Sequence, residues 1–245
     1  MPSFFESLGR SCGRVARKAR WLGQELTGTE DEALEAEGRV GRDLAEALAA
    51  ELPDGQKPAA DAQVDACGSR LVACVRNRKR QFRFLVLPGP QLNALALPGG
   101  FIYVTQPLLT LCAAQEDDLA FVLAHEMAHV IRFHVKDRIL GSSLLSLMIG
   151  AAPGSGALRQ ALRQMARQFL NSEYSQEQEL EADAFGVKLV RHAGYEPAAG
   201  LRVLRLLQTQ LGGAAEGRGY FSSHPPFATR VANLKQCLQG SVKAG

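Results

Sequence analysis

One short motif constrains this chain more than any other feature: an HExxH sequence at residues 125–129, inside an apolar stretch, 118–131, that predicts a helix. Two histidines four residues apart lie on the same helix face, so His125 and His129 can reach one metal ion. Glu126 would lean over the same site. This arrangement is typical of zinc proteases.

A catalytic zinc site takes three protein ligands and keeps an open position for water, so a third ligand must come from elsewhere in the chain. In metzincins it is a histidine ten residues after the first, but Val135 stands there, and His134 is one residue off and on a different helical face. A later acid-rich helix, 171–186, carries Glu179 and Asp183 four residues apart on one face. Glu179 is therefore the best candidate for the third ligand.

Residues 92–104 predict a β-hairpin, because two apolar strands flank a Pro-Gly-Gly turn. In a purely structural interpretation this hairpin is half of a small antiparallel sheet. In a functional interpretation, an edge strand beside a zinc site holds an extended peptide through main-chain hydrogen bonds. The candidate substrate strand comprises Asn93, Ala94, Leu95 and Ala96.

Helical periodicity dominates the rest of the chain. A capping box of Thr29 and Glu32 opens a first helix that ends at the turn after residue 52. Alternating apolar residues predict a strand over 81–87. Further helices are expected at residues 60–75, 157–170, 197–211 and 226–238. The expected fold class is α+β, mostly α, with a small antiparallel sheet packed on the HExxH helix.

The composition is that of an ordinary globular protein, with 46% hydrophobic and 22% charged residues, and one domain over residues 29–245 is the simplest organisation. A formal net charge of +3 is too small to favour nucleic-acid binding, so no such role is assigned. The five cysteines are odd in number and form no CxxC pair. They are expected to be small buried side chains rather than disulfides or zinc ligands.

Residues 1–28 form a separate basic amphipathic segment, with apolar side chains among arginines. It could lie on an anionic membrane as a peripheral contact, or be a solvated or locally docked helix. A transit peptide is disfavoured by Glu6. The segment lacks the apolar core of a signal peptide, and the longest apolar run, 139–153, is too short to span a bilayer. A cytoplasmic or membrane-surface location is therefore expected.

The three motifs, in their order, resemble the HtpX-like and CAAX-prenyl-protease-like zinc metallopeptidases, which are gluzincins. The resemblance rests on the stretch 93–100, the HExxH motif at 125–129, and an ExxxD motif at 179–183. It covers about residues 40 to 240 and is greatest to members without membrane spans. It implies a zincin-like metalloprotease core.

The resemblance also implies roles for single residues. His125, His129 and Glu179 would bind one zinc ion per chain, and Glu126 would be the general base. Asp183 would orient His125 or His129 by accepting the N–H of the ring nitrogen that faces away from the metal.

The family also carries a late His-Pro segment followed by an arginine, matched here by His224 and Arg230. His224 would stabilise the oxyanion or cover the metal in a resting state, or else it is a helix-capping residue of a turn. Gln176 departs from the family, which often has arginine there. The segment 139–170 is either a mobile cover over the cleft or an ordinary helical pair closing the core.

These features lead to a functional hypothesis of a zinc-dependent endopeptidase that hydrolyses protein or peptide substrates, with a role in protein quality control. The alternative is a chaperone-like module that binds peptides with little turnover. The presence of Glu126 favours the enzyme. A purely structural helical protein would require all three motifs to be accidental.

Overall fold

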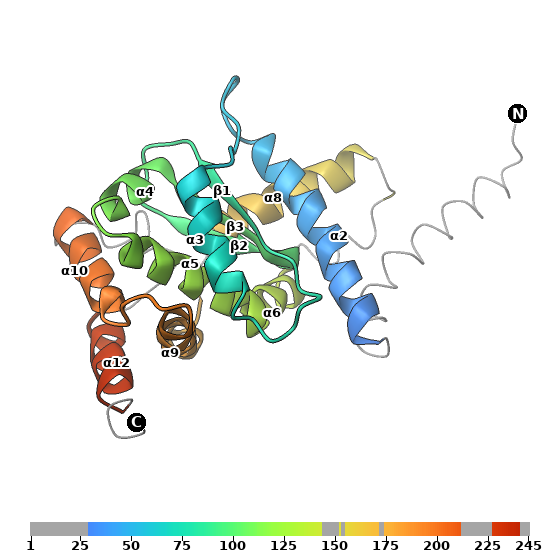
Figure 1. The fold of residues 1–245 in the computed structure, drawn as a ribbon. Helices are drawn as coiled ribbons and strands as arrows, with labels where there is room; N and C mark the ends of the chain where they lie inside the picture. Colours follow the sequence, from blue (N-terminus) through green and yellow to red (C-terminus); the bar gives the residue numbers. More distant parts are fainter. Residues whose placement is uncertain (1–28, 144–151, 153–154, 172–173, 212–226, 241–245) are drawn as a thin grey trace, which may run out of the picture.

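The chain folds into a mostly helical structure around one small sheet, in a computed structural model that describes residues 29–143, 152, 155–171, 174–211 and 227–240 (Figure 1). The helices are α2 (Glu30–Ala49), α3 (Ala62–Val72), α4 (Gln106–Cys112), α5 (Glu116–Ile131), α6 (His134–Leu140), α8 (Gly156–Asn171), α9 (Gln176–His192), α10 (Ala199–Leu211) and α12 (Phe227–Gly240). The strands are β1 (Arg83–Leu87), β2 (Ala94–Leu97) and β3 (Phe101–Thr105), with the short 3-10 helix η1 (Pro98–Gly100) between β2 and β3. The α+β, mostly α fold is thereby confirmed. The predictions for residues 1–28 and for His224 lie outside the described residues and stay predictions.

The sheet has the strand order β1-β3-β2. β2 and β3 pair antiparallel around η1, with Leu95 opposite Tyr103, so the predicted hairpin is confirmed. β1 instead pairs parallel with β3, with Arg83 opposite Phe101, and the sheet is therefore mixed. The expectation of a wholly antiparallel sheet was wrong because the chain crosses over after β1 instead of turning straight back along it.

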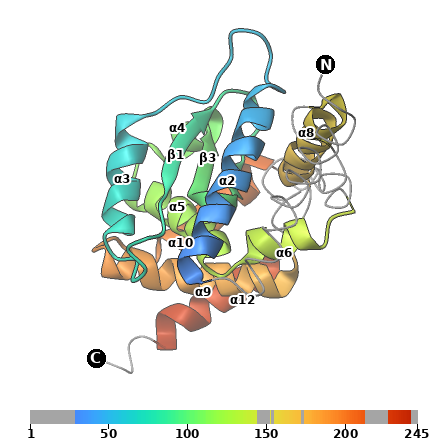
Figure 2. The ribbon, with the colours of Figure 1, turned by 90° about the vertical axis from the view of Figure 1, so that its right-hand side faces the viewer.

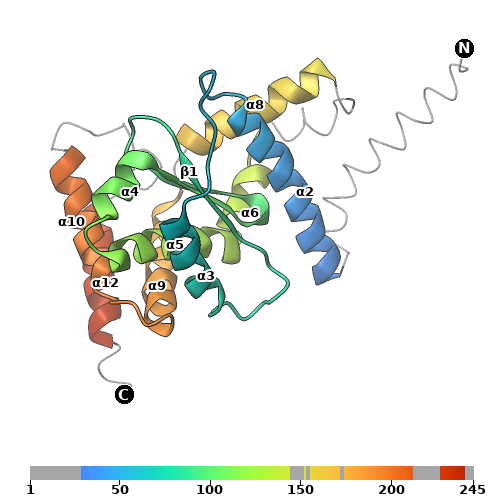
Figure 3. The ribbon, with the colours of Figure 1, turned by 45° about the horizontal axis from the view of Figure 1, so that its top comes forward.

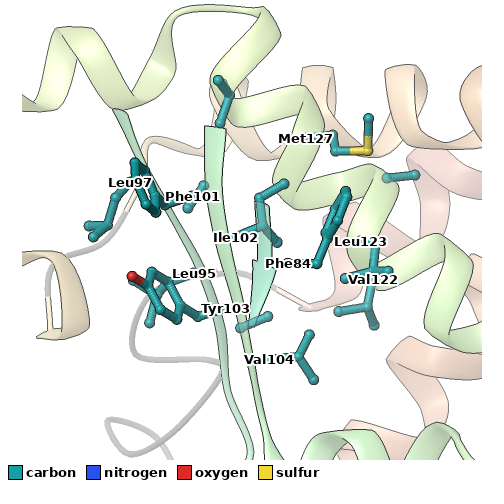
Figure 4. Close-up of a cluster of buried hydrophobic side chains, with 14 of the residues drawn as sticks. Phe84, Leu95, Leu97, Phe101, Ile102, Tyr103, Val104, Val122, Leu123 and Met127 are labelled. Atoms are coloured by element: carbon teal, nitrogen blue, oxygen red, sulfur yellow. The ribbon is translucent and has the colours of Figure 1, made fainter. Parts of the chain in front are cut away.

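The two faces of the sheet carry two sets of apolar side chains, as the alternation along a strand requires. Figure 4 shows Phe84, Ile102 and Val104 on the same side as three residues of α5, namely Val122, Leu123 and Met127. Leu95, Leu97, Phe101 and Tyr103 lie on the opposite side in the same figure. The HExxH helix thus rests on one face of the sheet, as expected.

α5 is buried on all sides, and every residue from Asp118 to Val130 is shielded from solvent. It packs against the sheet, α3, α9 and α10, and glycines bring two of these helices close. A Cβ atom at Gly200 of α10 would lie only 2.6 Å from the Phe121 ring, and one at Gly186 of α9 would lie 3.5 Å from the His125 backbone nitrogen. A helix packed this tightly holds its side chains in fixed rotamers, which a metal ligand needs.

The remaining helices surround this centre on two sides. α9, α10 and α12 lie on one side of the molecule and α2 and α8 on the other (Figures 1 and 3). α3 packs against β1, and α2 packs against η1 and β2, so that the strands appear between these two helices in Figure 2. α8 packs against α2 and β2. Much of the connection between α6 and α8 lies outside the described residues.

A buried ion pair fastens α2 to the hairpin. Glu37 accepts hydrogen bonds from Arg80 at 3.1 and 3.2 Å and from the backbone N–H of Gly99 at 3.0 Å. Gly41 permits this contact, because a Cβ atom there would lie 1.9 Å from the carbonyl oxygen of Pro98. The predicted capping box at the start of α2 is also confirmed. α2 is therefore an integral part of the core.

Other expectations from the sequence can be compared with the described residues. Cys67 and Cys112 are buried and Cys74 and Cys237 half-buried, all as free thiols. Burial raises the pKa of the Cys67 thiol to about 11. His192 is an exposed residue at the end of α9. None of the helices in the described part of the chain is both long and apolar enough to cross a membrane.

Candidate metal centre

The two HExxH histidines and the distant glutamate converge on one point. His125 and His129 of α5 and Glu179 of α9 each offer a ligand atom, and these atoms lie within 4.8 Å of one another. The His125 and His129 Nε2 atoms are 3.1 Å apart. Glu179 Oε2 lies 3.5 Å from His125 Nε2, and its Oε1 lies 3.3 Å from His129 Nε2. All three side chains are fully buried.

The other ring nitrogen of His125 is held by α9. Asp183 Oδ1 lies 3.0 Å from His125 Nδ1. Arg230 of α12 donates to both oxygens of Asp183, at 2.9 and 2.7 Å, and its Nη1 lies 2.9 Å from Glu179 Oε2. One guanidinium therefore fixes both the proposed ligand carboxylate and the carboxylate that orients a ligand histidine.

The pKa values of His125 and Asp183 follow from burial and from the neighbouring charges. Burial and the Arg230 charge lower the pKa of His125, but hydrogen bonds with Asp183 and Glu179 outweigh them and raise it to about 9. Burial raises the pKa of Asp183, yet the Arg230 charge and the hydrogen bond with His125 hold it below its ordinary value. The neighbouring carboxylates therefore favour the protonated, positively charged form of the His125 imidazole.

His129 is flanked by two residues that the sequence analysis did not identify as part of the site. The Tyr174 ring stacks on the His129 ring with centroids 3.7 Å apart, and the Arg138 guanidinium lies 4.3 Å from the centroid of the Tyr174 ring. His134 Nδ1 lies 3.1 Å from His129 Nδ1. No sequence signal identifies Tyr174. His134 could have been identified if the HExxH helix had been expected to end before it, because His134 is then not bound to that helix's face.

Glu126, the expected general base, follows His125 on α5 and is fully buried. It is close enough to Tyr174 for their charges to interact. Burial raises the pKa of the Tyr174 hydroxyl, the Arg138 charge opposes this, and the Glu126 carboxylate raises the pKa further. Glu126 and Tyr174 therefore share one low-dielectric pocket with the ligand His129.

The candidate substrate strand, β2, stands at the edge of the sheet. The backbone N–H of Thr105 donates to the carbonyl of Asn93 at 2.9 Å, so these two residues form a hydrogen-bonded pair. Such pairs alternate along antiparallel strands, so Ala94 and Ala96 direct their backbone groups away from β3. All four residues of β2 are buried, so this edge of the sheet is covered in the structure. The Asn93 N–H donates to the Thr105 hydroxyl, so these two residues hold the hairpin together at the end away from its turn.

Comparison with known proteins adds an independent observation. The model of Peptidase family M48 matches residues 58–238, which include the hairpin, α5, α9 and Arg230. The chain belongs to peptidase family M48. The resemblance drawn from the three motifs is thereby confirmed.

Several M48 relatives resemble the chain over much of its length. Mitochondrial metalloendopeptidase OMA1 of Schizosaccharomyces pombe is 27% identical over 212 residues, which cover 85% of this chain and 63% of that protein. Metalloprotease LoiP of Escherichia coli is 31% identical over 159 residues, covering 62% and 61%. The beta-barrel assembly-enhancing protease of Escherichia coli is 26% identical over 186 residues, covering 70% and 37%. The chain thus spans less than two thirds of each of these relatives.

Membership of family M48 groups the chain with metallopeptidases and implies a metal cofactor. The residues present fit a divalent cation. Three atoms bound tetrahedrally at 2.0–2.1 Å lie about 3.3 Å apart, close to the separations between the three ligand atoms. Arg230 contacts the buried carboxylates of Glu179 and Asp183, and Glu126 is a third buried carboxylate, so the buried carboxylates outnumber the one guanidinium and suit a bound cation.

The sequence-predicted site residues thus fall into three groups. The structure brings His125, Glu126, His129, Glu179, Asp183 and Arg230 together. β2 lies at the sheet edge, and of its predicted substrate residues Ala94 and Ala96 have the suitable backbone direction. His224 lies outside the described residues, and Gln176 is exposed at the first turn of α9.

Proposed function

We propose that this M48 chain is a zinc-dependent endopeptidase. The observation that carries the proposal is the convergence of His125, His129 and Glu179 beside the buried Glu126. Two imidazoles and one carboxylate are the ligand set of several catalytic zinc sites, and a tetrahedral ion keeps a fourth position open. Zinc is preferred because nitrogen and carboxylate ligands at these separations suit it, with one ion per chain.

The chemistry divides between the metal and the protein. A zinc ion held by the three ligands would lower the pKa of water towards about 7 and polarise the scissile carbonyl. Glu126 takes the proton of the attacking water and passes it to the leaving nitrogen.

The proposed substrate is an extended stretch of protein or peptide that adds to the edge of β2. Ala94 and Ala96 are buried, so the edge must first be uncovered; their backbone groups, which point away from β3, would then form the hydrogen bonds, as in other cases of strand addition. Recognition through the main chain tolerates many side-chain sequences. It therefore suits a role in protein quality control, and the name of the Escherichia coli beta-barrel assembly-enhancing protease is compatible with such a role.

The test is zinc content and casein cleavage by the purified chain and its Glu126→Gln variant. The chain is expected to retain about one zinc ion and to cleave casein, while the variant keeps the zinc and loses cleavage. Zinc below about 0.2 per chain, or equal cleavage by both proteins, refutes the proposal. Binding of casein without cleavage by the wild type would favour the chaperone-like alternative.

The third ligand has its own test. Glu179→Gln is expected to weaken zinc retention by about 10-fold or more, because it removes a charged ligand. Glu177→Gln is the matched control, since Glu177 is exposed on the same helix. Equal zinc retention by the two variants would mean that Glu179 is not a ligand.

A further inference from the structure

His134 is a buried histidine that the proposed chemistry does not use. It lies at the start of α6 and is only 3% exposed. Its Nδ1 lies 3.1 Å from His129 Nδ1, and its Nε2 lies 2.9 Å from Glu181 Oε2. Glu181 in turn accepts a hydrogen bond from Arg132 at 2.6 Å. These contacts form a continuous line from the metal centre to a half-exposed ion pair.

The order of protons along this line is fixed if His129 binds a metal ion through Nε2. A neutral imidazole carries one proton, so that proton must then be on Nδ1 of His129. His129 donates it to Nδ1 of His134, which must therefore be an acceptor. The His134 proton is then on Nε2, where the Glu181 carboxylate accepts it. Each donor thus meets one acceptor.

The chain reaches this arrangement through an unusual turn. In a continuing helix, a residue five positions after His129 would lie on a different face. α5 instead ends before Phe133, which adopts a left-handed conformation with φ of 63°. This turn starts α6 in a new direction and brings His134 back beneath His129. A left-handed phenylalanine costs about 1–2 kcal/mol in general, so the surrounding packing must hold it in place.

We propose that His134 is a positioning residue for the metal ligand His129, with Glu181 and Arg132 holding His134 in its tautomer. The two ligand histidines are thus oriented by separate systems. His125 depends on the fully buried Asp183, whereas His129 depends on a neutral ring backed by Glu181, whose side chain is 40% exposed. This inference rests on the metal site proposed above.

The test compares two variants of similar size, His134→Leu and His134→Asn. The asparagine oxygen takes nearly the place of the histidine Nδ1 and keeps an acceptor for His129, whereas leucine does not. Zinc dissociation constants are measured by competition with a chromogenic chelator. His134→Leu is expected to weaken zinc binding by about 10- to 100-fold. His134→Asn is expected to lose about fivefold at most.

Two further measurements separate positioning from a merely structural role. Circular dichroism of the two metal-free variants at the assay temperature should show that both are folded, so that a difference in zinc affinity does not come from unfolding. In the zinc-loaded wild type, long-range proton–nitrogen NMR spectra should show His134 protonated on Nε2 and His129 on Nδ1. Equal zinc affinity of the leucine and asparagine variants, or a proton on Nδ1 of His134, overturns the proposal.

A negative result for the role of His134 can be distinguished from failure of the proposed function. If the wild type binds no zinc, the metal site itself is refuted. If the wild type binds zinc and His134→Leu binds it equally well, only the positioning role is refuted. His192→Leu serves as the control, because His192 is exposed at the end of α9 and should retain the wild-type zinc affinity.

Discussion

Replacement of Arg230 by methionine should strongly destabilise the metal-free protein. The guanidinium makes three charged contacts of 2.7 to 2.9 Å with Asp183 and Glu179, and all three side chains are fully buried. Methionine fills most of the volume of the arginine stem but leaves Asp183 and Glu179 with the His125 imidazole as their remaining positively charged neighbour among these contacts. The variant therefore isolates the electrostatic contribution of the guanidinium.

The magnitude follows from the burial of this cluster. Removal of one partner of a buried ion pair costs about 3–5 kcal/mol, because the remaining charge is left uncompensated. For a chain of this size each kcal/mol lowers the melting temperature by about 2–4 °C, so a drop of about 6–20 °C is expected. The upper half of this range applies because one guanidinium serves both carboxylates.

The assay is thermal unfolding followed by circular dichroism in the presence of a metal chelator. Arg39→Met is the matched control, because Arg39 pairs with Glu35 at 3.4 Å on the surface and its side chain is 48% exposed. The control should melt at the wild-type temperature. If Arg230→Met melts within about 2 °C of the wild type, the buried carboxylates do not need the guanidinium, and the reasoning is refuted.

Three other predictions test the turn, the hairpin and the substrate edge. Gly100→Ala should lower the free energy of unfolding in urea by more than about 3 kcal/mol, because its Cβ would lie 2.0 Å from a backbone oxygen. Gly55→Ala, whose Cβ would have nothing within 4 Å, should lower it by only about 1–2 kcal/mol. Equal losses for the two variants would contradict this. Phe133→Val should be less stable than Phe133→Gly by about 1–2 kcal/mol, since only glycine adopts the left-handed turn without strain; a more stable valine variant would exclude that turn. Ala96→Pro should raise KM for casein, because it removes an N–H that points away from β3, whereas Leu95→Pro should break the pairing with β3 and lower the melting temperature by more than Ala96→Pro does. An unchanged KM for Ala96→Pro would place the substrate elsewhere.

Much of the metal site could be predicted because its signals are local. The spacing of His125 and His129 needs only a helix, and the same holds for Glu179 and Asp183. The family resemblance identified Arg230 as a candidate residue near the site, but neither it nor the spacing showed that Arg230 joins both carboxylates. The parallel pairing of β1 with β3 was missed, because alternation identifies the faces of a strand but not its neighbours.

The contacts of His134 and Tyr174 depend on the tertiary structure. His134 was set aside because the helix was assumed to continue through Phe133, a residue type that gives no signal for a left-handed turn. Tyr174 precedes α9, and its contact with His129 depends on how α9 packs against α5. Sequence patterns describe single helices well, but they do not describe the angle at which two helices meet.

The attachment of α2 has a consequence for where this catalytic unit begins. The family model matches from residue 58, yet α2 ends at Ala49 and supplies Glu37, the buried partner of Arg80. A chain shortened to residues 58–245 would leave the Arg80 charge unpaired and expose the core side chains under Leu44 and Leu48. The region that the family model matches is thus smaller than the unit that must fold. A minimal active fragment of this chain should start before Thr29, where the cap of α2 is kept intact.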